Sequence, residues 1–299
     1  MQGLALIIKE IEEDITQDLL RCGLLFRIFS RVKTSHSIQH KIDQKGDKYR
    51  LEHKKMQDLL GLRITLYFSD DVEMLYNFLR NKKNFVDESK DFVEIDKFCP
   101  QRLNLIMRVP EHRKEDFDDI ISDFHSPDLI DDTYEIQIRT VLSEGWHEVE
   151  HDLRYKCKED WVEYPFHSRT LNGIYATLET SEWSMLSLFN QMAHENYKNG
   201  KWIALMRNKM RIRYVDNELS DNIVEFLNTN KGIAKKILRS SREQILHKML
   251  NNHFRMPITY DAIIHLINRC EIHCKQLEDM ESEILKRGLN DFLTDGNNE

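Results

Sequence analysis

Glycine and proline, the residues that most often interrupt regular structure, are scarce in this chain: 10 and 5 of 299 residues. This scarcity excludes a collagen-like or low-complexity chain and favours a large helical content. No apolar run approaches the roughly 20 residues that span a bilayer, so we expect no membrane partner. The first residues lack the basic start and the small-residue cleavage site of a secretory signal, so none is expected.

Cysteine is also scarce, and its positions follow no regular spacing: Cys22, Cys99, Cys157, Cys270 and Cys274. An odd, scattered set argues against a dense disulfide framework and is typical of free thiols in a reducing compartment. With no membrane-spanning pattern beside it, this usage of cysteine predicts a soluble cytoplasmic protein.

The net charge of −8 is distributed unevenly along the chain. Residues 201–255 contain 12 Lys and Arg against 5 Asp and Glu, so this segment carries +7 while the remainder is acidic. One interpretation is a surface that contacts RNA or another acidic partner. The other is a set of solvated helix faces, and composition does not separate the two.

Apolar periodicity divides the chain into a mixed half and a helical half. The predicted strands cover residues 62–68, 102–109 and 134–140. The predicted helices around them cover residues 4–29, 70–81, 111–124 and 142–155. After Pro165 only helical periodicity remains, over residues 167–198, 201–213, 218–250 and 259–287. The pattern predicts an α+β fold, with a mixed β-sheet domain over 1–160 and a mostly helical region over 161–299.

One metal-binding pattern occurs in a predicted helix, where His147, Glu148 and His151 satisfy H-E-x-x-H. In a zinc protease the two imidazoles would hold zinc and the glutamate would act as general base. A catalytic zinc also needs a third protein ligand, and the downstream sequence lacks the spacing of the longer metzincin motif. We therefore interpret the match as coincidental.

Charged groups lie beside predicted strands in three separate segments. The first is a cationic, hydroxyl-rich stretch with Arg31, Lys33, Ser37 and Lys41. In the second, Asp58 precedes a strand and lies five residues before Arg63. In the third, one face of a strand carries Glu135, Gln137 and Arg139, and the other face is apolar. Each has a plain structural explanation, but together they supply phosphate-binding cations and two carboxylates for Mg²⁺, as nucleotide pyrophosphoryl transfer requires.

These segments resemble, in order and spacing, the synthetase domain of the RelA/SpoT family, and most closely its small alarmone synthetases. The resemblance rests on SRVKTSHSIQHKI, QDLLGLRITLYF, and YEIQIRT followed by WHEVEHDLRYK, and it covers about residues 25–160. It implies a nucleotidyltransferase-like sheet and transfer of pyrophosphate from ATP to the 3′-hydroxyl of a guanosine nucleotide. Some relatives act instead on adenosine nucleotides or on the 3′ end of tRNA.

The resemblance also implies a role for each matching residue. Asp58 and Glu135 would be the catalytic residues and the ligands of Mg²⁺, with Glu135 also able to deprotonate the attacking hydroxyl. The ATP-binding residues would be Arg31, Lys33, Ser37, Lys41 and Arg63. The acceptor-binding residues would be Asn104, Gln137, Arg139, Glu150 and His151.

The acceptor side departs from the family pattern. Family members have Gly-Tyr-Arg-Ser-x-His where this chain has CPQRLN, so Pro100 replaces the tyrosine that stacks on guanine and Asn104 replaces the histidine. Loss of that aromatic ring would remove about 1–3 kcal/mol of stacking. The acceptor stays open between GTP or GDP, an adenosine nucleotide and tRNA, which residues 201–255 would bind. A catalytically degenerate nucleotide-sensing or interaction module is the alternative function, and assembly into a homo-oligomer is left open.

Overall fold

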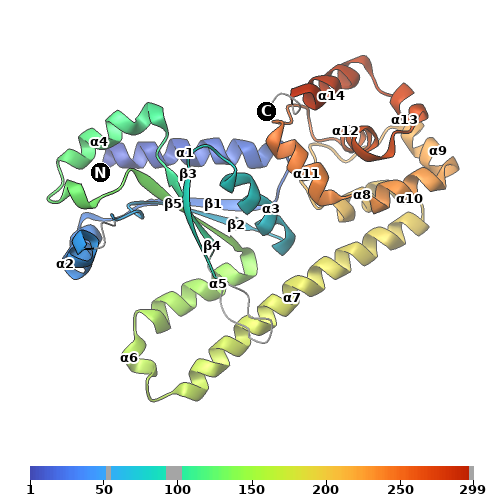
Figure 1. The fold of residues 1–299 in the computed structure, drawn as a ribbon. Helices are drawn as coiled ribbons and strands as arrows, with labels where there is room; N and C mark the ends of the chain where they lie inside the picture. The colour runs from blue at the N-terminus through green and yellow to red at the C-terminus, as the bar shows by residue number, and fades with distance from the viewer. Residues whose placement is uncertain (52–54, 92–102, 296–299) are drawn as a thin grey trace. The chain divides into compact units, whose positions relative to one another are not determined.

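The computed structural model describes residues 1–51, 55–91 and 103–295 (Figure 1). The chain forms two compact units, which we call the sheet unit and the helical unit. The sheet unit comprises Met1–Thr16 and Phe26–Thr180, and the helical unit comprises Gln17–Leu25 and Ser181–Glu299. The division falls inside helix α7 (Pro165–Lys198), beyond residue 160, where the strand patterns of the sequence end.

One five-stranded sheet organises the sheet unit, in the order β1-β2-β5-β4-β3. The strands are β1 (Phe26–Val32), β2 (Leu60–Leu66), β3 (Phe85–Lys90), β4 (Leu103–Arg108) and β5 (Thr133–Thr140). Strands β2 and β5 are parallel, and the other neighbours are antiparallel. A mixed sheet followed by a helical region confirms the predicted fold class.

The two faces of this sheet differ in polarity because side chains alternate along each strand. On one face Leu62, Ile64 and Ile136 are at most 1% exposed. Helix α1 (Gln2–Arg21) reaches this buried face, where Ser30 of β1 donates a hydrogen bond to Glu12. Helices α3 (Ser69–Arg80) and α4 (Lys114–Ser122) add further buried apolar side chains. The opposite face, which we call the open face, carries the polar residues.

Other elements of the sheet unit border the open face. Helix α2 (Ser35–Leu51) follows β1, and helix α5 (Val141–Glu150) follows β5 directly. A capping box at Thr140 and Ser143 fixes the start of α5, because each residue satisfies a backbone N–H of the other. A π-helical turn over His151–Tyr155 and the short helix α6 (Lys158–Trp161) then lead into α7.

The structure corrects three expectations about the sheet unit. The helix predicted over 4–29 ends at Arg21, because Gly23 adopts a left-handed conformation (φ 70°) and β1 begins at Phe26. Strand β3 was not predicted, since its sequence FVDESK is polar and it lies at the sheet edge. Helix α2 forms in a polar segment for which no helix was predicted.

The helical unit contains seven α-helices besides the ends of α1 and α7, counted over its described residues. They are α8 (Trp202–Met210), α9 (Asp221–Thr229), α10 (Lys231–Arg239), α11 (Arg242–Asn251), α12 (Tyr260–Ile267), α13 (Lys275–Asp279) and α14 (Glu283–Asp295). The single helix predicted over 218–250 is wrong: the backbone leaves the helical conformation at Asn230 and again at Ser240 and Ser241. The one predicted over 259–287 is likewise divided into α12, α13 and the start of α14. Among the described residues, no helix combines the length and apolar character needed to cross a bilayer.

Candidate functional site

Neighbouring strands align polar residues in rows across the open face. In one row Arg31 of β1 lies beside Gly61 of β2, and Gly61 lies beside Glu135 of β5. The next row contains Phe29, Arg63, Gln137 and Asn104. A pocket of about 160 Å³ lies over these rows, and its lining residues are Phe29, Ser30, Arg31, Gly61, Leu62, Arg63, Glu135, Gln137 and Glu148. Four residues that the sequence predicts for the site therefore line one pocket.

Gly61 allows an arginine to cross the sheet surface. A Cβ atom at this position would lie 3.4 Å from both Cγ and Nε of Arg31, which is tighter than most real contacts of a Cβ. The Arg31 side chain therefore lies directly over the glycine, in the pocket that also contains Glu135. A larger residue at position 61 would displace this cation.

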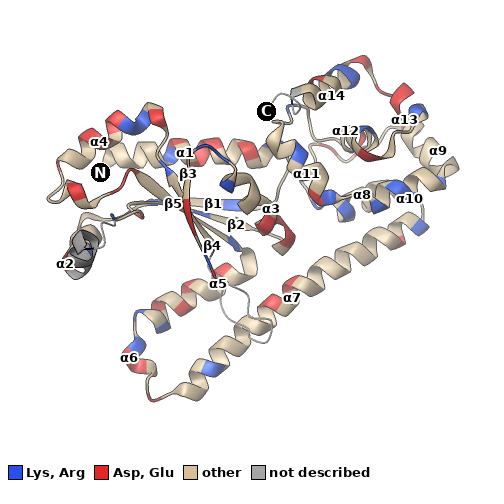
Figure 2. Ribbon diagram, viewed as in Figure 1, with Lys and Arg blue, Asp and Glu red and all other residues tan. Residues whose placement is uncertain are grey.

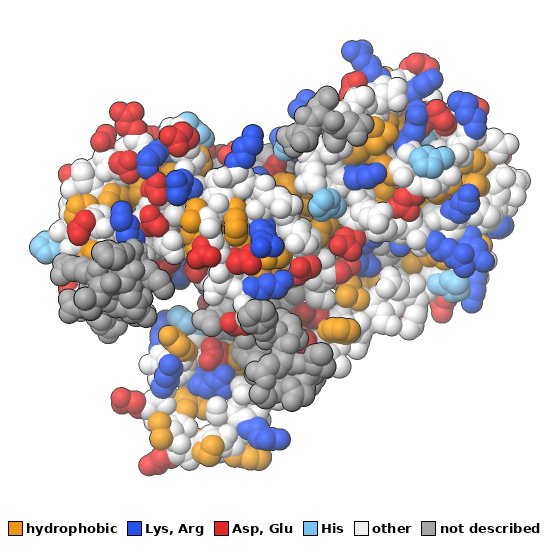
Figure 3. Space-filling view, in the orientation of Figure 1, with side chains coloured by type: hydrophobic (Ala, Val, Ile, Leu, Met, Phe, Trp, Pro, Cys, Tyr) orange, Lys and Arg blue, Asp and Glu red, His pale blue; other side chains and the backbone are white. Residues whose placement is uncertain are grey.

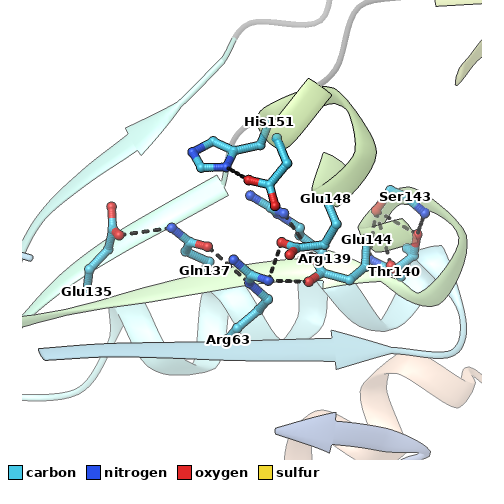
Figure 4. A network of polar contacts seen from close by, with 10 residues as sticks. Arg63, Glu135, Gln137, Arg139, Thr140, Ser143, Glu144, Glu148 and His151 are labelled. Carbon is cyan, nitrogen blue, oxygen red and sulfur yellow. Dashed lines mark hydrogen bonds and ion pairs between the residues drawn. The ribbon is translucent and has the colours of Figure 1, made fainter. Parts of the chain in front are cut away.

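Neutral amide groups hold the carboxylate of Glu135. Asn104 Nδ2 donates to Oε1 at 2.8 Å, and Gln137 Nε2 donates to Oε2 at 3.0 Å (Figure 4 shows the Gln137 contact). A carboxylate has about four lone-pair sites, so two amide bonds orient Glu135 and leave it able to accept a proton or bind a cation. Asn104 and Gln137, predicted to bind the acceptor, are positioned here as the partners of Glu135.

Arg63 lies at the centre of the network in Figure 4. Its Nη1 donates to Glu144 Oε1 at 2.6 Å and also to Glu148, while its Nε donates to Gln137 Oε1 at 3.3 Å. Arg139 donates to the other oxygen of Glu144 at 3.0 Å. The two glutamates occupy i and i+4 on α5 and so share one side of that helix. Sequence reasoning missed them as site residues, although this spacing directly after the β5 motif was the available signal.

The second predicted carboxylate, Asp58, has charged partners instead of neutral ones. Lys33 Nζ lies 2.6 Å from Oδ2, and Lys41 Nζ lies 2.8 Å from Oδ1 and 2.7 Å from Oδ2. Burial alone would raise the pKa of Asp58, but the hydrogen bonds from both lysines hold it below its usual range. Burial lowers the pKa of Lys33 in spite of its bond to Asp58.

The local backbone explains why these three residues meet. The Lys33 N–H donates to Leu59 O at 2.9 Å, so the β1–β2 ladder continues past both strands and brings Lys33 to the segment that carries Asp58. Helix α2 is anchored by Ile38, which is 4% exposed, and Lys41 follows it within the same turn. Ser37 lies one turn before Lys41, and its backbone N–H donates to Thr34 Oγ1 at 3.3 Å.

Of the five residues predicted to bind the acceptor, Gln137 alone lines the pocket, and Glu150 and His151 have partners away from it. Glu150 accepts a hydrogen bond from Arg154 at 3.3 Å, and Arg154 also donates to Ser168 and Asn172 of α7. His151 lies 3.0 Å from Asp152 through Nδ1. In the structure Glu150 therefore belongs to the contacts between α5 and α7, and His151 lies exposed at the end of α5.

The residues of the H-E-x-x-H pattern have other partners. His147 is buried, and burial first, with the nearby charges of Arg139 and Arg63, lowers its pKa to about 4. Glu148 binds Arg63, and His151 binds Asp152. Across the described ranges, no three His, Cys, Asp or Glu side chains come close enough to hold a metal ion by themselves. Of the residues in this pattern, Glu148 lines the pocket and His147 packs against Trp146.

A second hollow of about 420 Å³ lies between α4 and the segments that precede β2 and β5. Its Lys114 pairs with two of its carboxylates, with Asp132 at 2.5 Å and Asp118 at 3.8 Å. None of the residues predicted for the site lines it, so the pocket on the open face is the candidate site.

Comparison with known proteins identifies a region that includes all the residues lining this pocket except Phe29. Residues 30–160 match the family model described as the region found in RelA / SpoT proteins. The GTP pyrophosphokinase YwaC of Bacillus subtilis is 28% identical over 135 residues, which are 44% of this chain and 59% of that protein. The GTP pyrophosphokinase YjbM of the same organism is 30% identical over 131 residues, 43% of this chain and 56% of that protein. The matches thus span less than two thirds of either relative.

Solved structures of similar proteins were also found. The small alarmone synthetase 1 from B. subtilis bound to its product pppGpp has a TM-score of 0.47 at 21% identity, covering 62% of this chain and 92% of that one. The small alarmone synthetase 2 from B. subtilis has a TM-score of 0.46 at 22% identity, covering 62% and 96%.

Proposed function

Since residues 30–160 of this chain match the region found in RelA / SpoT proteins, we propose that the protein transfers pyrophosphate from ATP to the 3′-hydroxyl of a nucleotide acceptor. The observation that carries this proposal is Glu135, a carboxylate that two amides orient in a pocket shared with Arg31 and Arg63. Such a site combines a proton acceptor with cations for phosphate oxygens.

The proposed reaction forms one bond and breaks one. The acceptor 3′-oxygen attacks the β-phosphorus of ATP, the bond from that phosphorus to the α-phosphate oxygen breaks, and AMP leaves. Glu135 accepts the proton of the 3′-hydroxyl. Arg31, lying over Gly61 beside Glu135, offsets the negative charge that grows on the phosphate oxygens. No covalent enzyme intermediate is required, because holding two nucleotides in position supplies much of the rate.

The donor-binding role falls to the cations at the edge of β1 and on α2. Lys33 and Lys41 converge on one point, and Ser37 lies one turn before Lys41. An ATP polyphosphate bound there would receive charge-assisted hydrogen bonds from both ammonium groups. Arg63 is engaged by Glu144 and Glu148, so its direct role is to fix the pocket wall.

The proposed cofactor is Mg²⁺. Its two candidate ligands, Glu135 and Asp58, differ in how accessible their oxygens are to a metal ion. Proteins commonly bind this ion with one or two carboxylates, while substrate phosphates and water complete the coordination. Glu135 fits without rearrangement, because its partners are neutral amides. Asp58 fits once a lysine has moved from its oxygens. When bound, Mg²⁺ would offset phosphate charge and help to orient the ATP.

The experiment that tests the proposal is transfer of label from [γ-³²P]ATP to a panel of GTP, GDP, ATP, AMP and bulk tRNA. We expect a labelled product with at least one acceptor, and its loss in Glu135→Gln. A protein that binds ATP tightly yet labels no acceptor in the presence of Mg²⁺ would instead be the nucleotide-sensing module.

A tRNA acceptor is favoured by one feature of the helical unit. On α10, Lys235, Lys236 and Arg239 are exposed, and none of them forms an ion pair within the described residues. Figure 2 marks the Lys and Arg positions of this helix along its ribbon, and Figure 3 shows charged side chains on one face of the molecule. Arg242, expected beside them on one helix, begins α11 instead and is buried, donating to Met210 O at 2.6 Å. The cationic surface is therefore smaller than the sequence predicts, but it lies open to a phosphate backbone.

Salt dependence tests the tRNA acceptor. Contact with several phosphates makes binding weaken steeply as ionic strength rises. We expect wild type to bind tRNA at low salt and Lys235→Glu/Arg239→Glu to lose that binding. Transfer to a free mononucleotide that the double variant leaves unchanged, with no tRNA binding by wild type, would eliminate tRNA and retain the pyrophosphokinase.

A further inference from the structure

Two lysines share one carboxylate at the place where the proposed function requires all three groups to bind other partners. Both oxygens of Asp58 accept hydrogen bonds from Lys41, and Oδ2 also accepts one from Lys33. In the proposed reaction the lysines hold ATP phosphates and Asp58 holds Mg²⁺. The groups that would bind the two components of Mg·ATP are thus bound to each other in the free protein.

We propose that Lys33 and Lys41 leave Asp58 for the ATP phosphates when Asp58 receives Mg²⁺, so that the protein binds Mg·ATP as a unit and binds either component poorly alone. This inference rests on the proposed function and concerns how the same site loads its donor. It predicts a strong thermodynamic coupling between the metal and the nucleotide.

Electrostatics explains why neither component suffices. Metal-free ATP would have to draw both ammonium groups away and leave the half-buried Asp58 carboxylate unpaired beside more negative charge. Mg²⁺ alone would have to approach a carboxylate already covered by two cations. With both present, every cation keeps an anionic partner, since phosphate replaces carboxylate for the lysines and the metal replaces the lysines for Asp58.

The side chains suit such an exchange. Lys33, Lys41 and Asp58 are 20%, 25% and 24% exposed, so all three are partly covered yet reachable from solvent. A lysine is a point charge on a flexible stem and can change partners with little movement of the backbone. The backbone positions are fixed by the Lys33 N–H bond to Leu59 and by buried Ile38 on α2. Only the side chains need to move.

The variant Asp58→Asn distinguishes the proposed exchange from a general increase in ATP affinity that Mg²⁺ would produce without it. The measurement is calorimetric titration of the full-length protein with α,β-methylene-ATP, in excess EDTA and again in Mg²⁺. For wild type we expect Mg²⁺ to tighten binding by about 30-fold or more, since two charge-assisted contacts must change partner. For Asp58→Asn we expect metal-free binding about tenfold tighter than in wild type, and a Mg²⁺ effect below about threefold.

Asp131→Asn is the matched control. Asp131 lies in the segment joined to that of Asp58 by the Met56–Ile130 bridge. Its carboxylate accepts hydrogen bonds from two neutral groups, Gln57 Nε2 and the Asp132 N–H. The Asp131→Asn substitution removes one negative charge from the same part of the fold, as Asp58→Asn does, but it releases no lysine. We therefore expect its metal-free binding to equal that of wild type. If both variants bound the metal-free ATP analogue equally more tightly than wild type, the change in net charge would explain the effect, and the proposed exchange would be overturned.

The converse variant provides a second measurement that does not depend on the folding of Asp58→Asn. Lys41→Met should expose Asp58 to a metal in the absence of nucleotide, so Mn²⁺ binding measured by electron paramagnetic resonance should tighten severalfold over wild type. The exchange is overturned if metal-free nucleotide binding by Asp58→Asn stays within twofold of wild type. If wild type binds the ATP analogue under neither condition, the proposed function fails as well.

Discussion

The two carboxylates of the candidate site occupy neighbouring strand regions but differ in their partners. Two lysines surround Asp58, whereas two neutral amides hold Glu135. Cationic partners hold the pKa of Asp58 low and occupy its oxygens, while amide partners orient Glu135 without cancelling its charge. Under the proposed function this difference would separate two tasks, because the first carboxylate would belong to a donor-binding cluster and the second would be available to the reacting hydroxyl.

Removal of either charge provides the largest test of this division. Glu135→Gln and Asp58→Asn should each lower pyrophosphate transfer at least about 10²-fold, as expected for loss of a base or metal ligand. The comparison predicts a different effect on binding: ATP affinity in EDTA stays at the wild-type value in Glu135→Gln and rises in Asp58→Asn. Radiolabel transfer and calorimetry measure the two quantities. Near-wild-type transfer by either variant, with an unchanged circular dichroism spectrum, would contradict the assignment of that carboxylate.

A smaller loss is expected when the amide partners of Glu135 are removed. Asn104→Ala should lower the rate constant about tenfold and leave the affinity for Mg·ATP unchanged, because it releases one oxygen of Glu135 while the lysine cluster stays intact. The discriminating measurement is kcat against KM for ATP. Asn104→Gln restores an amide on a longer side chain and should recover part of the loss, which a purely structural role for Asn104 would not predict.

Displacement of Arg31 should have a still smaller effect, on donor affinity. Gly61→Ala places a methyl group 3.4 Å from Arg31 Cγ and Nε, so ATP binding should weaken about threefold to tenfold as one phosphate contact shifts. Gly145→Ala on α5 is the matched control, since apart from its own chain neighbours and helix backbone no atom lies within 4 Å of the added Cβ. That control should bind ATP as wild type does and gain about 0.5–1 kcal/mol of helix stability. Equal ATP affinity in the two variants would show that Arg31 does not contact the donor.

The smallest predicted effect concerns stability and pH. The pKa of Asp58 is lowered in the folded protein from its ordinary value of 3.8, so its ion pairs contribute stability above that pH and lose it as the pH falls through the folded value. The difference in unfolding free energy between wild type and Asp58→Asn should therefore be constant above about pH 5 and shrink below pH 4. Urea titrations at several pH values measure it. A difference that grows on acidification would mean that the lysines do not stabilise the charged form.

Much of the open face could be predicted from the sequence, because the residue patterns that define it lie within short continuous segments. Alternation over Tyr134–Thr140 places Glu135, Gln137 and Arg139 on one face, and the structure confirms that face. Lys33, Lys41 and Asp58 were also singled out by residue type and spacing, and the structure brings these three side chains together. These features need only the two-residue period of a strand and the short segments around it.

The contacts that distinguish the two carboxylates depend on pairing between distant segments. Asn104 meets Glu135 only because β4 pairs with β5, and Arg63 meets Glu144 only because β2 lies beside β5. Neither neighbour relation nor register can be read from an isolated segment. Strand β1 was missed for a related reason, since its apolar residues continue the helical period of α1 and become a strand through pairing with β2.

The attachment of α5 to α7 has a practical consequence for excised fragments. Trp146 Nε1 donates to Leu171 O at 2.9 Å, and Arg154 donates to Asn172 Oδ1 at 2.8 Å, so both partners lie beyond the end of the family match at residue 160. A fragment trimmed to that match would leave the helix that carries Glu144 and Glu148 without its outer support. Expression trials that aim at the isolated sheet unit should therefore retain α1 and extend through the first turns of α7, to Tyr175 or beyond.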